Sequence, residues 1–368
     1  MSGRIVIFGY GPTGRATAER LLQEGREVVV AQRHAPPSLP EGATFVACDA
    51  LDRDAVVRTA RQGEQFVVTI GFAYRGDVWR EVWPKAVGNF VAACETTGAR
   101  MVFIDNLYMY GPQTAPLVET MPLSNYGRKP AARSVATRIW MEASAQGRAR
   151  VAALRAPDFY GPGVGLSYLG DVSIGAMAKG KAAMFIGSPD LPHDYAYVPD
   201  ISRAAASLLA APDTAFGQAW HVPCAPTRTT RQVLQTAADA LGMKLRLQAV
   251  PEFLLGPLGL FVPFLRERKE MGFTFDRPYR VDSSKFAKAF WSDPTPFEEG
   301  VFKTALAFRS AAERTPRPGG RQRASLLGRR PGTASPPSQT SASGSPSVTS
   351  VGGTEMRGSR PGLASRSK

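Results

Sequence analysis

Three glycines near the start of the chain, Gly9, Gly11 and Gly14, have the spacing G-x-G-x-x-G, which suits the binding of a phosphate group. The first glycine permits a tight turn, the second lets a pyrophosphate approach the backbone, and the third lets a helix pack closely on a strand. An apolar run at 5–8 predicts a buried strand before the glycines, and a helical pattern follows them and stops at Gly25. Free N–H groups at the start of such a helix attract an anion. The pattern therefore predicts a dinucleotide-binding site.

The end of the second predicted strand, which begins at 28–30, indicates which dinucleotide is bound. An acidic residue here would bond the 2′-hydroxyl of the adenosine ribose, whereas an arginine accommodates a 2′-phosphate. The strand runs on through Gln32 and Arg33 to His34 without a carboxylate. The planar guanidinium of Arg33 suits a phosphate and His34 offers a further donor, although Arg33 could also be a solvated residue at a strand end. We expect NADP in preference to NAD.

Further predicted strands at 44–47, 65–70 and 100–104 alternate with helical segments. This alternation predicts an α/β fold with a doubly wound parallel sheet, in which ligands lie at the carboxyl ends of the strands. Asp49, at the end of the third strand, could cap the next helix or accept a hydrogen bond from an adenine amine. The expected cofactor contacts are Gly9, Gly11, Pro12, Thr13, Gly14, Gln32, Arg33, Asp49, Ala50, Ile70 and Gly71.

Four ordered segments carry a resemblance to a known family. They are 109–112 (MYGP), 125–129 (NYGRK), 155–163 (RAPDFYGPG) and 195–201 (YAYVPDI). In order and spacing they resemble motifs of the extended short-chain dehydrogenases/reductases, the NAD-dependent epimerase/dehydratase family. The resemblance covers about residues 3–305. It implies a Rossmann-type domain, a smaller and partly interleaved substrate domain, and NAD(P)-linked chemistry, often on nucleotide sugars.

The resemblance also implies a set of catalytic residues. In this family a tyrosine is the acid/base for a substrate hydroxyl or carbonyl, a lysine four residues later lowers its pKa and holds the nicotinamide ribose, and a serine or threonine polarises the same oxygen. Here Tyr126 is present, but Pro130 stands at the lysine position and Lys129 comes one residue early. Asn106 occupies the hydroxyl position. Because proline is favoured in the first helical turn, we expect the helix to begin near Lys129.

Three interpretations of this altered motif remain open. In the first, Tyr126 and Lys129 converge from a loop and a helix start, while the asparagine amide donates to the substrate oxygen. In the second, the acid/base is another group near the nicotinamide: Tyr108, Tyr110 or Asp105. In the third, the protein binds NADP without turnover and acts as a redox sensor or regulator.

The second half of the chain is expected to supply the substrate side. Asp158, His193 and Asp194 are polar residues expected to line or cap this region, and the apolar run 253–265 is expected to form a lid. Such an apolar wall argues against a highly charged sugar nucleotide. Asp200 is expected to be the N-cap of the alanine-rich helix that follows it.

The last part of the chain, 311–368, has a different composition. It is rich in Ser, Gly, Pro, Thr and Arg, and its ten Lys and Arg against two Asp and Glu give it +8 of the net charge of +14. We therefore expect a disordered basic tail and no specific nucleic-acid partner. The predicted organisation is a dinucleotide-binding domain at 1–155, a substrate portion at 156–310 and this tail.

Cysteine spacing and hydropathy narrow the remaining possibilities. Cys48, Cys94 and Cys224 match neither a metal-binding nor a disulfide pattern, so no metal site is expected. A strand begins within four residues of the N-terminus, which argues against a signal peptide, and the longest apolar run is too short to span a bilayer. We expect a cytoplasmic location and no membrane span, and a homodimer is compatible with the sequence.

Together these observations predict an NAD(P)-dependent oxidoreductase or epimerase-like enzyme that acts on a carbonyl or hydroxyl of a small organic or sugar-like substrate. The alternative is an NADP-binding regulatory or redox-sensing protein without turnover.

Overall fold

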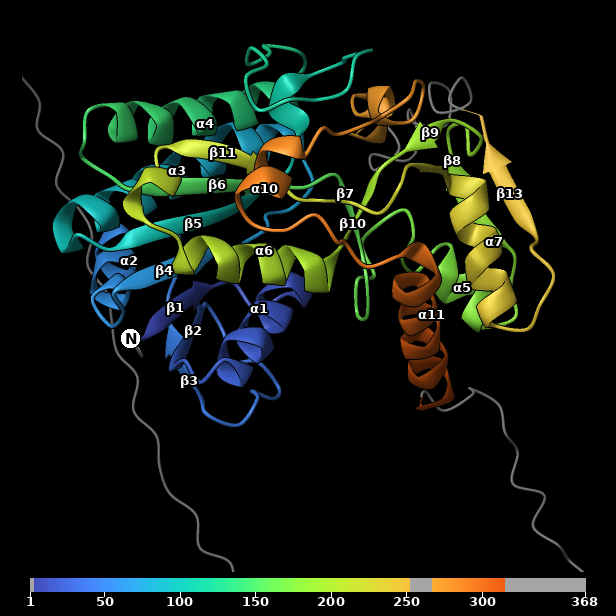
Figure 1. Ribbon diagram of the computed structural model, residues 1–368, viewed down its shortest axis with the longest axis horizontal. Helices are drawn as coiled ribbons and strands as arrows, with labels where there is room; N and C mark the ends of the chain where they lie inside the picture. The colour runs from blue at the N-terminus through green and yellow to red at the C-terminus, as the bar shows by residue number, and fades with distance from the viewer. Residues whose placement is uncertain (1–2, 252–266, 315–368) are drawn as a thin grey trace, which may run out of the picture. The chain divides into compact units, whose positions relative to one another are not determined.

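Short runs that are buried over most of their length form the central sheet, and its edge strand at 43–47 is the partly exposed exception. The computed structural model describes residues 3–251 and 267–314 (Figure 1). Its seven parallel strands follow the order β11-β6-β5-β4-β1-β2-β3. They are β1 (Ile5–Phe8), β2 (Val28–Gln32), β3 (Ala43–Ala47), β4 (Gln65–Val68), β5 (Arg100–Asp105), β6 (Val151–Arg155) and β11 (Gln218–His221). This is the doubly wound, Rossmann-type sheet that the sequence predicts.

Two helical layers cover the sheet because side chains alternate along each strand. In β1, Val6 and Phe8 belong to the core shared with α2, α3 and α4, while Ile5 and Ile7 belong to the core shared with α1 and α6. Figure 1 shows α3 and α4 on one face and α1 and α6 on the other. The bounds are α1 (Pro12–Gln23), α2 (Arg53–Ala60), α3 (Gly76–Thr97), α4 (Lys129–Ala145) and α6 (Val198–Ala210).

The strand order reverses at β1, which lies between β4 and β2. In open parallel sheets a crevice forms at this switch point, outside the carboxyl ends of the strands. The glycine motif follows β1 directly, and the loops after β2, β3 and β4 reach the same edge. The fold therefore gathers the predicted cofactor residues on one side of the sheet.

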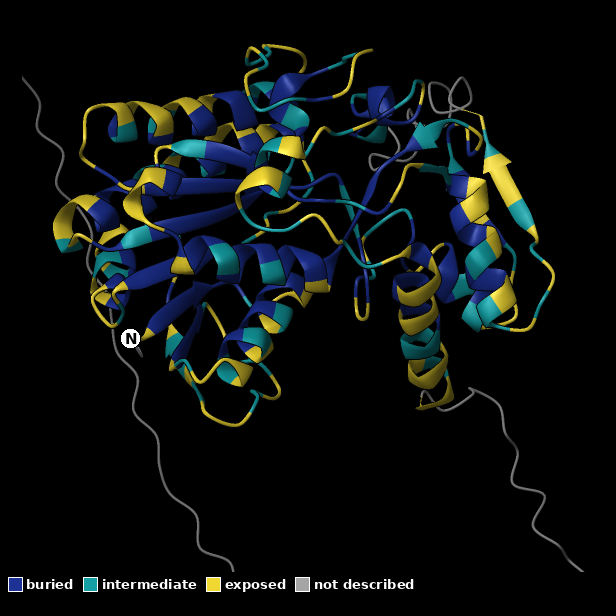
Figure 2. Cartoon of the chain, viewed as in Figure 1, coloured by how far each residue is buried: buried dark blue, intermediate teal, exposed yellow. Residues whose placement is uncertain are grey.

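Most of the remaining elements form a smaller layer with its own core. Figure 2 shows buried faces on α5 and α7 within this layer, while much of β13 is exposed. Its elements are β7 (Asp158–Tyr160), α5 (Ile174–Ala178), β8 (Ala183–Ile186), β9 (Pro192–His193), β10 (Tyr195–Tyr197), β12 (Arg228–Thr229), α7 (Thr230–Ala240), β13 (Leu247–Val250) and α11 (Phe297–Arg314). Three strand pairs, β7 with β10, β8 with β13 and β9 with β12, link this layer. Four short elements complete the described chain: η1 (Tyr108–Tyr110), η2 (Asp213–Ala215), η4 (Gly272–Thr274) and α10 (Ser284–Ala289).

The predicted boundary at 155/156 remains a prediction. The strand β11 and the helix α6, both from the second half of the chain, complete the sheet and one of its covering layers. The helix α11 continues to Arg314, so the tail predicted from residue 311 begins with a helical turn. The rest of that tail and the predicted lid at 253–265 lie outside the described residues.

The prediction for Asp200 is wrong. The helix α6 begins at Val198 with Tyr197 as its N-cap, which places Asp200 inside the first turn. There its two carboxylate oxygens accept hydrogen bonds from the backbone N–H and the hydroxyl of Thr295, at 2.8 and 2.9 Å. Asp200 thus ties α6 to the segment that precedes α11.

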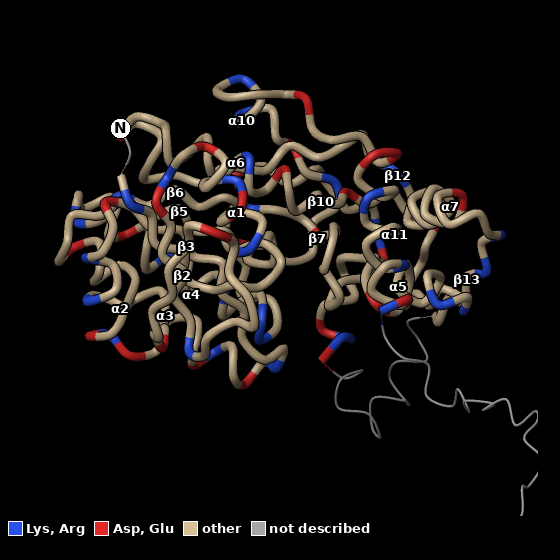
Figure 3. Tube along the Cα trace, turned by 90° about the horizontal axis from the view of Figure 1, so that it is seen from below, with Lys and Arg blue, Asp and Glu red and all other residues tan. Residues whose placement is uncertain are grey.

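Basic and acidic residues are interspersed along the described chain (Figure 3). Among residues 3–251 and 267–314, no group of three or more His, Cys, Asp or Glu is placed to hold a metal ion. Within the same residues no helix is both long and apolar enough to cross a membrane.

Candidate functional site

The glycine motif forms a cradle whose three positions differ physically. Gly9 has a positive φ of 100°, which only glycine adopts without strain. A Cβ on Gly14 would lie 2.1 Å from the carbonyl oxygen of Gly9, so α1 can pack this closely only on a glycine. A Cβ on Gly11 would meet no atom within 4 Å. Gly11 therefore faces open space, as a backbone that a pyrophosphate must approach would do.

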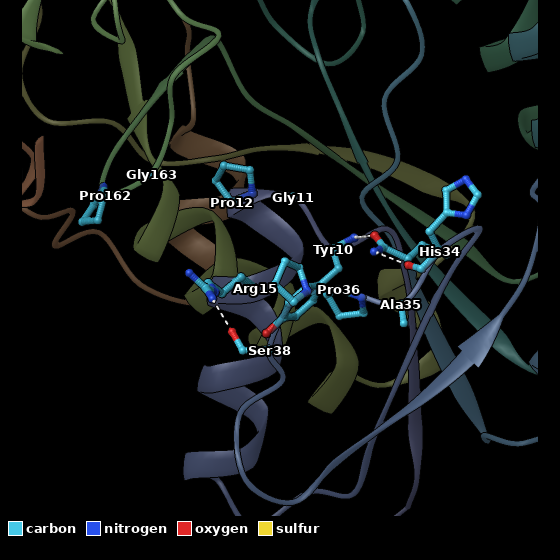
Figure 4. A pocket seen from close by; sticks show the side chains of 12 residues that line it. Tyr10, Gly11, Pro12, Arg15, His34, Ala35, Pro36, Ser38, Pro162 and Gly163 are labelled. Atoms are coloured by element: carbon cyan, nitrogen blue, oxygen red, sulfur yellow. Dashed lines mark hydrogen bonds between the residues drawn. The ribbon is translucent and has the colours of Figure 1, made fainter. Parts of the chain in front are cut away.

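Two neighbouring cavities open from this cradle. One, of about 410 Å³, lies between the start of α1, residues 34–38 and the turn at Pro162 and Gly163 (Figure 4). The other, of about 390 Å³, lies at the carboxyl ends of β1, β2, β3 and β4. Both cavities are lined by Tyr10, Gly11, Gln32 and His34. Together they extend along the edge of the sheet on which a dinucleotide would lie.

Most of the predicted cofactor residues line these cavities. The second cavity is lined by Gly9, Gly11, Gln32, Arg33, Asp49, Ala50, Ile70 and Gly71, and Pro12 lines the first. Thr13 and Gly14 line neither: the carbonyl of Thr13 accepts from the Thr17 hydroxyl at 2.8 Å, and Gly14 packs on Gly9.

Asp49 lines the second cavity and does not cap a helix. Its Oδ1 accepts from the backbone N–H of Leu51 at 2.9 Å. The N-cap of α2 is Asp52, which accepts from the N–H of Ala55 at 3.0 Å. The structure therefore excludes the helix-capping role for Asp49, and its contact with an adenine amine stays a prediction.

The end of β2 is neutral where an NAD-specific site would carry an acid. The Gln32 amide accepts from the backbone N–H of Tyr10 at 3.1 Å and donates to the carbonyl of His34 at 2.8 Å. The side chain of Gln32 therefore links the backbone of the glycine loop to the backbone at His34. Arg33 and His34, which follow it, are exposed. No carboxylate stands at this strand end.

Arg15 is a cavity residue that sequence reasoning missed. It lies in the first turn of α1, where its guanidinium reaches toward the hydroxyl of Ser38 at 3.5 Å (Figure 4). Its side chain is half exposed and lies 3.8 Å from the carboxylate of Glu19. The available signal was its position directly after the third glycine, in the first part of the helix that follows the motif.

The structure places Tyr126 and Lys129 in different surroundings. Tyr126 is 43 % exposed and its ring packs edge-to-face on Phe273, 5.5 Å between centroids. In the described part of the chain, no hydrogen bond or ring contact joins Tyr126 to Lys129. Asn106 follows β5, and its Oδ1 accepts from the N–H of Tyr108 at 2.9 Å.

Lys129 lies in a cage of two carboxylates. Its ammonium contacts Glu267 at 2.5 Å and Glu270 at 2.9 Å, also donates to the Glu267 carbonyl, and is 0 % exposed. The same two carboxylates cap helix starts: Glu267 accepts from the N–H of Gly76 at 2.8 Å, and Glu270 from the N–H of Lys129 at 2.8 Å. Although burial opposes it, hydrogen bonds from Lys129 and Gly76 hold the pKa of Glu267 below its usual value. The segment 267–270 thus holds α3 and α4 together through one buried cation.

Two groups of the second catalytic interpretation, Asp105 and Tyr110, are buried and paired, and the third, Tyr108, is partly buried. Asp105 forms an ion pair with Arg133, whose guanidinium stacks 3.7 Å from the Trp83 ring. Burial raises the pKa of both Tyr108 and Tyr110, which keeps these phenols protonated.

His221 belongs to the same buried region. Its Nδ1–H donates to the Asp282 carbonyl at 3.1 Å, so its Nε2 accepts from the Tyr110 hydroxyl at 3.0 Å. Burial lowers the pKa of His221 to about 3, with the Arg155 charge as a further cause. His221 is therefore a neutral, structural acceptor for Tyr110.

Comparison with known proteins agrees with this geometry. The model of the NAD dependent epimerase/dehydratase family matches residues 5–222, which contain the cradle, both cavities and α4. The chain belongs to this family. The chemistry of the family depends on a nicotinamide dinucleotide, and the open face at Gly11 fits one. No curated protein sequence matches the chain.

Solved structures of similar fold include epimerases and a dehydratase. UDP-glucose 4-epimerase from Thermus thermophilus, in complex with NAD, matches with a TM-score of 0.66 and 22% identity over 84% of this chain and 99% of that one. UDP-glucose 4-epimerase from Thermotoga maritima, with UDP-glucose, has a TM-score of 0.69 and 16% identity over 84% and 99%. A dTDP-glucose 4,6-dehydratase from Streptomyces venezuelae, with NAD bound, has a TM-score of 0.68 and 17% identity over 83% and 97%. At these identities the likeness concerns the fold.

Proposed function

We propose that this family member is an NADP(H)-dependent oxidoreductase that interconverts a carbonyl and a hydroxyl on a small organic substrate. The observation that carries the choice of cofactor is the neutral end of β2. Gln32 is bound to the backbone of its own loop, and no carboxylate is present there to accept from a ribose 2′-hydroxyl. Arg33 and His34 follow it, and Arg15 lies across the first cavity.

In this proposal the 2′-phosphate lies where the two cavities border each other. His34 lines both of them, Arg15 lines the first and Arg33 the second. Gly11 and the N-terminus of α1 would hold the pyrophosphate, and Asp49 would accept from the adenine amine. When bound, the cofactor supplies the hydride acceptor or donor.

The residues of the chain then handle the proton. We keep Tyr126 as the proposed acid/base and Asn106 as the donor to the reacting oxygen. Because the Asn106 Oδ1 is engaged by Tyr108, its amide N–H₂ is left to donate, and no acceptor holds it within the described residues. Lys129 completes the set that the family motif implies, but it reaches a cofactor only if it leaves its carboxylate cage.

A second candidate function is favoured by that cage. Pro130 takes the position of the family lysine, and the neighbouring Lys129 is occupied by Glu267 and Glu270. This arrangement supports a protein that binds NADP without turnover, as a regulator or redox sensor. A cytoplasmic location and a homodimer remain predictions under either function.

The choice of cofactor is tested with Arg33→Asp. We expect the change to weaken NADPH binding about tenfold or more and to leave NADH binding unchanged or improved, because it replaces a charge-assisted phosphate contact by repulsion. Binding is measured by the fluorescence of each reduced cofactor. Arg61→Asp, an exposed arginine at the end of α2, is the matched control for the change in charge. Equal affinity for both cofactors in the unchanged protein would refute the proposed phosphate site.

Catalysis is tested with Tyr126→Phe, which removes one exposed hydroxyl and keeps the contact with Phe273. We expect NADPH oxidation with a panel of aldehydes and ketones to fall by about 10²-fold or more, while the Kd for NADPH changes little. Tyr197→Phe, which removes a tyrosine hydroxyl from β10 and lines neither cavity, is the control. Undiminished turnover in Tyr126→Phe would show that a residue other than Tyr126 is the acid/base. Tight NADPH binding with no turnover of any panel member by the unchanged protein would favour the second candidate function.

A further inference from the structure

Three charged or titratable side chains, Asp158, His193 and Arg268, gather beyond the carboxyl ends of β4, β5 and β6. Asp158 begins β7, three residues after β6 ends, and its carboxylate lies 2.9 Å from Nε2 of His193. The His193 ring stacks on Phe275 at 4.2 Å, and Phe275 contacts Tyr168 at 3.7 Å. The Arg268 guanidinium lies 3.7 Å above the Tyr168 ring. The contacting rings of His193, Phe275 and Tyr168 therefore form an aromatic wall between Asp158 and Arg268.

Tyrosines from two sheet loops and from the segment after η4 complete the surroundings. Tyr74 follows β4, Tyr108 follows β5, and Tyr279 stacks on His193 at 5.1 Å. The charges of Asp158 and Arg268 both act on Tyr74 and Tyr108. Burial raises the pKa of all three phenols, so they are neutral donors. Through Tyr74 and Tyr108 the cluster lies beyond the same edge of the sheet as the cofactor cavities, although none of its residues lines them.

Several polar atoms of this cluster have no partner among the described residues. Nε of Arg268, Nδ1 of His193 and the hydroxyl of Tyr279 are buried there without a hydrogen bond. Most buried polar groups in folded proteins are satisfied, and three neighbouring exceptions indicate a place for a polar ligand. His193 is 1 % exposed and Tyr279 is 4 % exposed, so these two residues are buried.

Aromatic stacking holds the Arg268 side chain. Within residues 3–251 and 267–314 no hydrogen bond or ion pair engages its guanidinium. The charge of Asp158 acts on it, yet the two groups form no ion pair within the described residues. By contrast, Asp158 is fixed by His193 and keeps 12 % of its side chain exposed, which leaves an oxygen free to accept.

We propose that this cluster binds a small hydroxy acid with an apolar body, its carboxylate on Arg268 and its hydroxyl donating to Asp158. The planar guanidinium suits a carboxylate, and the ring wall of Tyr168 and Phe275 suits an apolar body. A diphosphate fits poorly, because a second anion would lie beside Asp158. This inference rests on the proposed function and names the substrate class of the same crevice.

The test measures binding rather than turnover, with mandelate as the probe because it carries a carboxylate, an adjacent hydroxyl and a phenyl ring. Phenylacetate lacks the hydroxyl, benzyl alcohol lacks the carboxylate, and UDP carries a diphosphate. Saturation-transfer NMR and competition give the Kd of each for the full chain with NADPH present. The variants are Arg268→Gln and Asp158→Asn, with Arg231→Gln as control, since Arg231 pairs with Asp190 on the exposed surface. Circular dichroism and the Kd for NADPH verify that each variant is folded.

We expect mandelate to bind the unchanged protein and the Arg231→Gln control equally, and Arg268→Gln at least about tenfold more weakly. Asp158→Asn should reduce the preference for mandelate over phenylacetate while both still bind. Equal mandelate affinity in Arg268→Gln, tighter binding of UDP than of mandelate, or no binding of any probe would each overturn the proposal. Failure of NADPH binding alone, with mandelate still bound through Arg268, would overturn the proposed cofactor and leave this site standing.

Discussion

At the scale of single residues, Lys129 belongs to a motif that predicts catalysis and also occupies a structural position between two helices. Its ammonium is fully buried between Glu267 and Glu270, and the ring of Tyr74 lies 4.9 Å away. Loss of activity in a Lys129 variant would therefore not by itself prove catalysis, because the same change removes the cation that joins α3 and α4. The test of catalysis has to rest on Tyr126, whose side chain is exposed.

The structural role of Lys129 leads to a prediction. Lys129→Met should lower the free energy of unfolding by about 3–5 kcal/mol, because it leaves two buried carboxylates without their cation. Urea denaturation followed by circular dichroism measures the change. The control is Lys303→Met, which removes an exposed ion pair with Glu299 on α11 and should cost at most about 1 kcal/mol. A loss as small as that of the control would mean that the cage contributes little to stability.

At the scale of elements, local patterns predicted the sheet and several helix boundaries. Gly98, with a positive φ of 73°, ends α3, and α4 begins at Lys129 ahead of a proline, as expected. The error at Asp200 has a local cause as well. Pro199 lies in the first turn of α6, and this proline was the stronger sign of the helix start than the acid that follows it.

Contacts between distant segments could not be predicted in the same way. Glu267 caps α3 through Gly76, which is 191 residues away, and no periodicity or motif connects these positions. The cage around Lys129 and the place of Arg268 opposite Asp158 depend on such packing. The family motif predicts roles for Tyr126 and Asn106 from their spacing, but their neighbours are set by the fold. Sequence therefore predicted the cofactor edge of the crevice in more detail than its substrate edge.

At the scale of the whole molecule, the net charge is unevenly distributed. The segment 315–368 contains nine Lys and Arg and one Glu, which is +8 of the total of +14. Residues 311–314 belong to α11, whose Phe308 packs near Gly175 in the smaller layer. A truncation that tests the charge of the tail must therefore spare these four residues.

Removal of 315–368 should reduce non-specific binding to nucleic acid and leave NADPH binding unchanged. The affinity of a basic segment for phosphate backbones falls steeply with salt, so the difference should be large near about 50 mM salt and small near about 200 mM. Retention on immobilised duplex DNA, measured at both salt concentrations, gives the effect, and the Kd for NADPH verifies that the site is intact. A full-length variant with the nine basic residues of the segment changed to Gln separates charge from length. Equal retention of truncated and full chains at low salt would mean that residues 1–314, whose net charge is only +6, carry the nucleic-acid affinity.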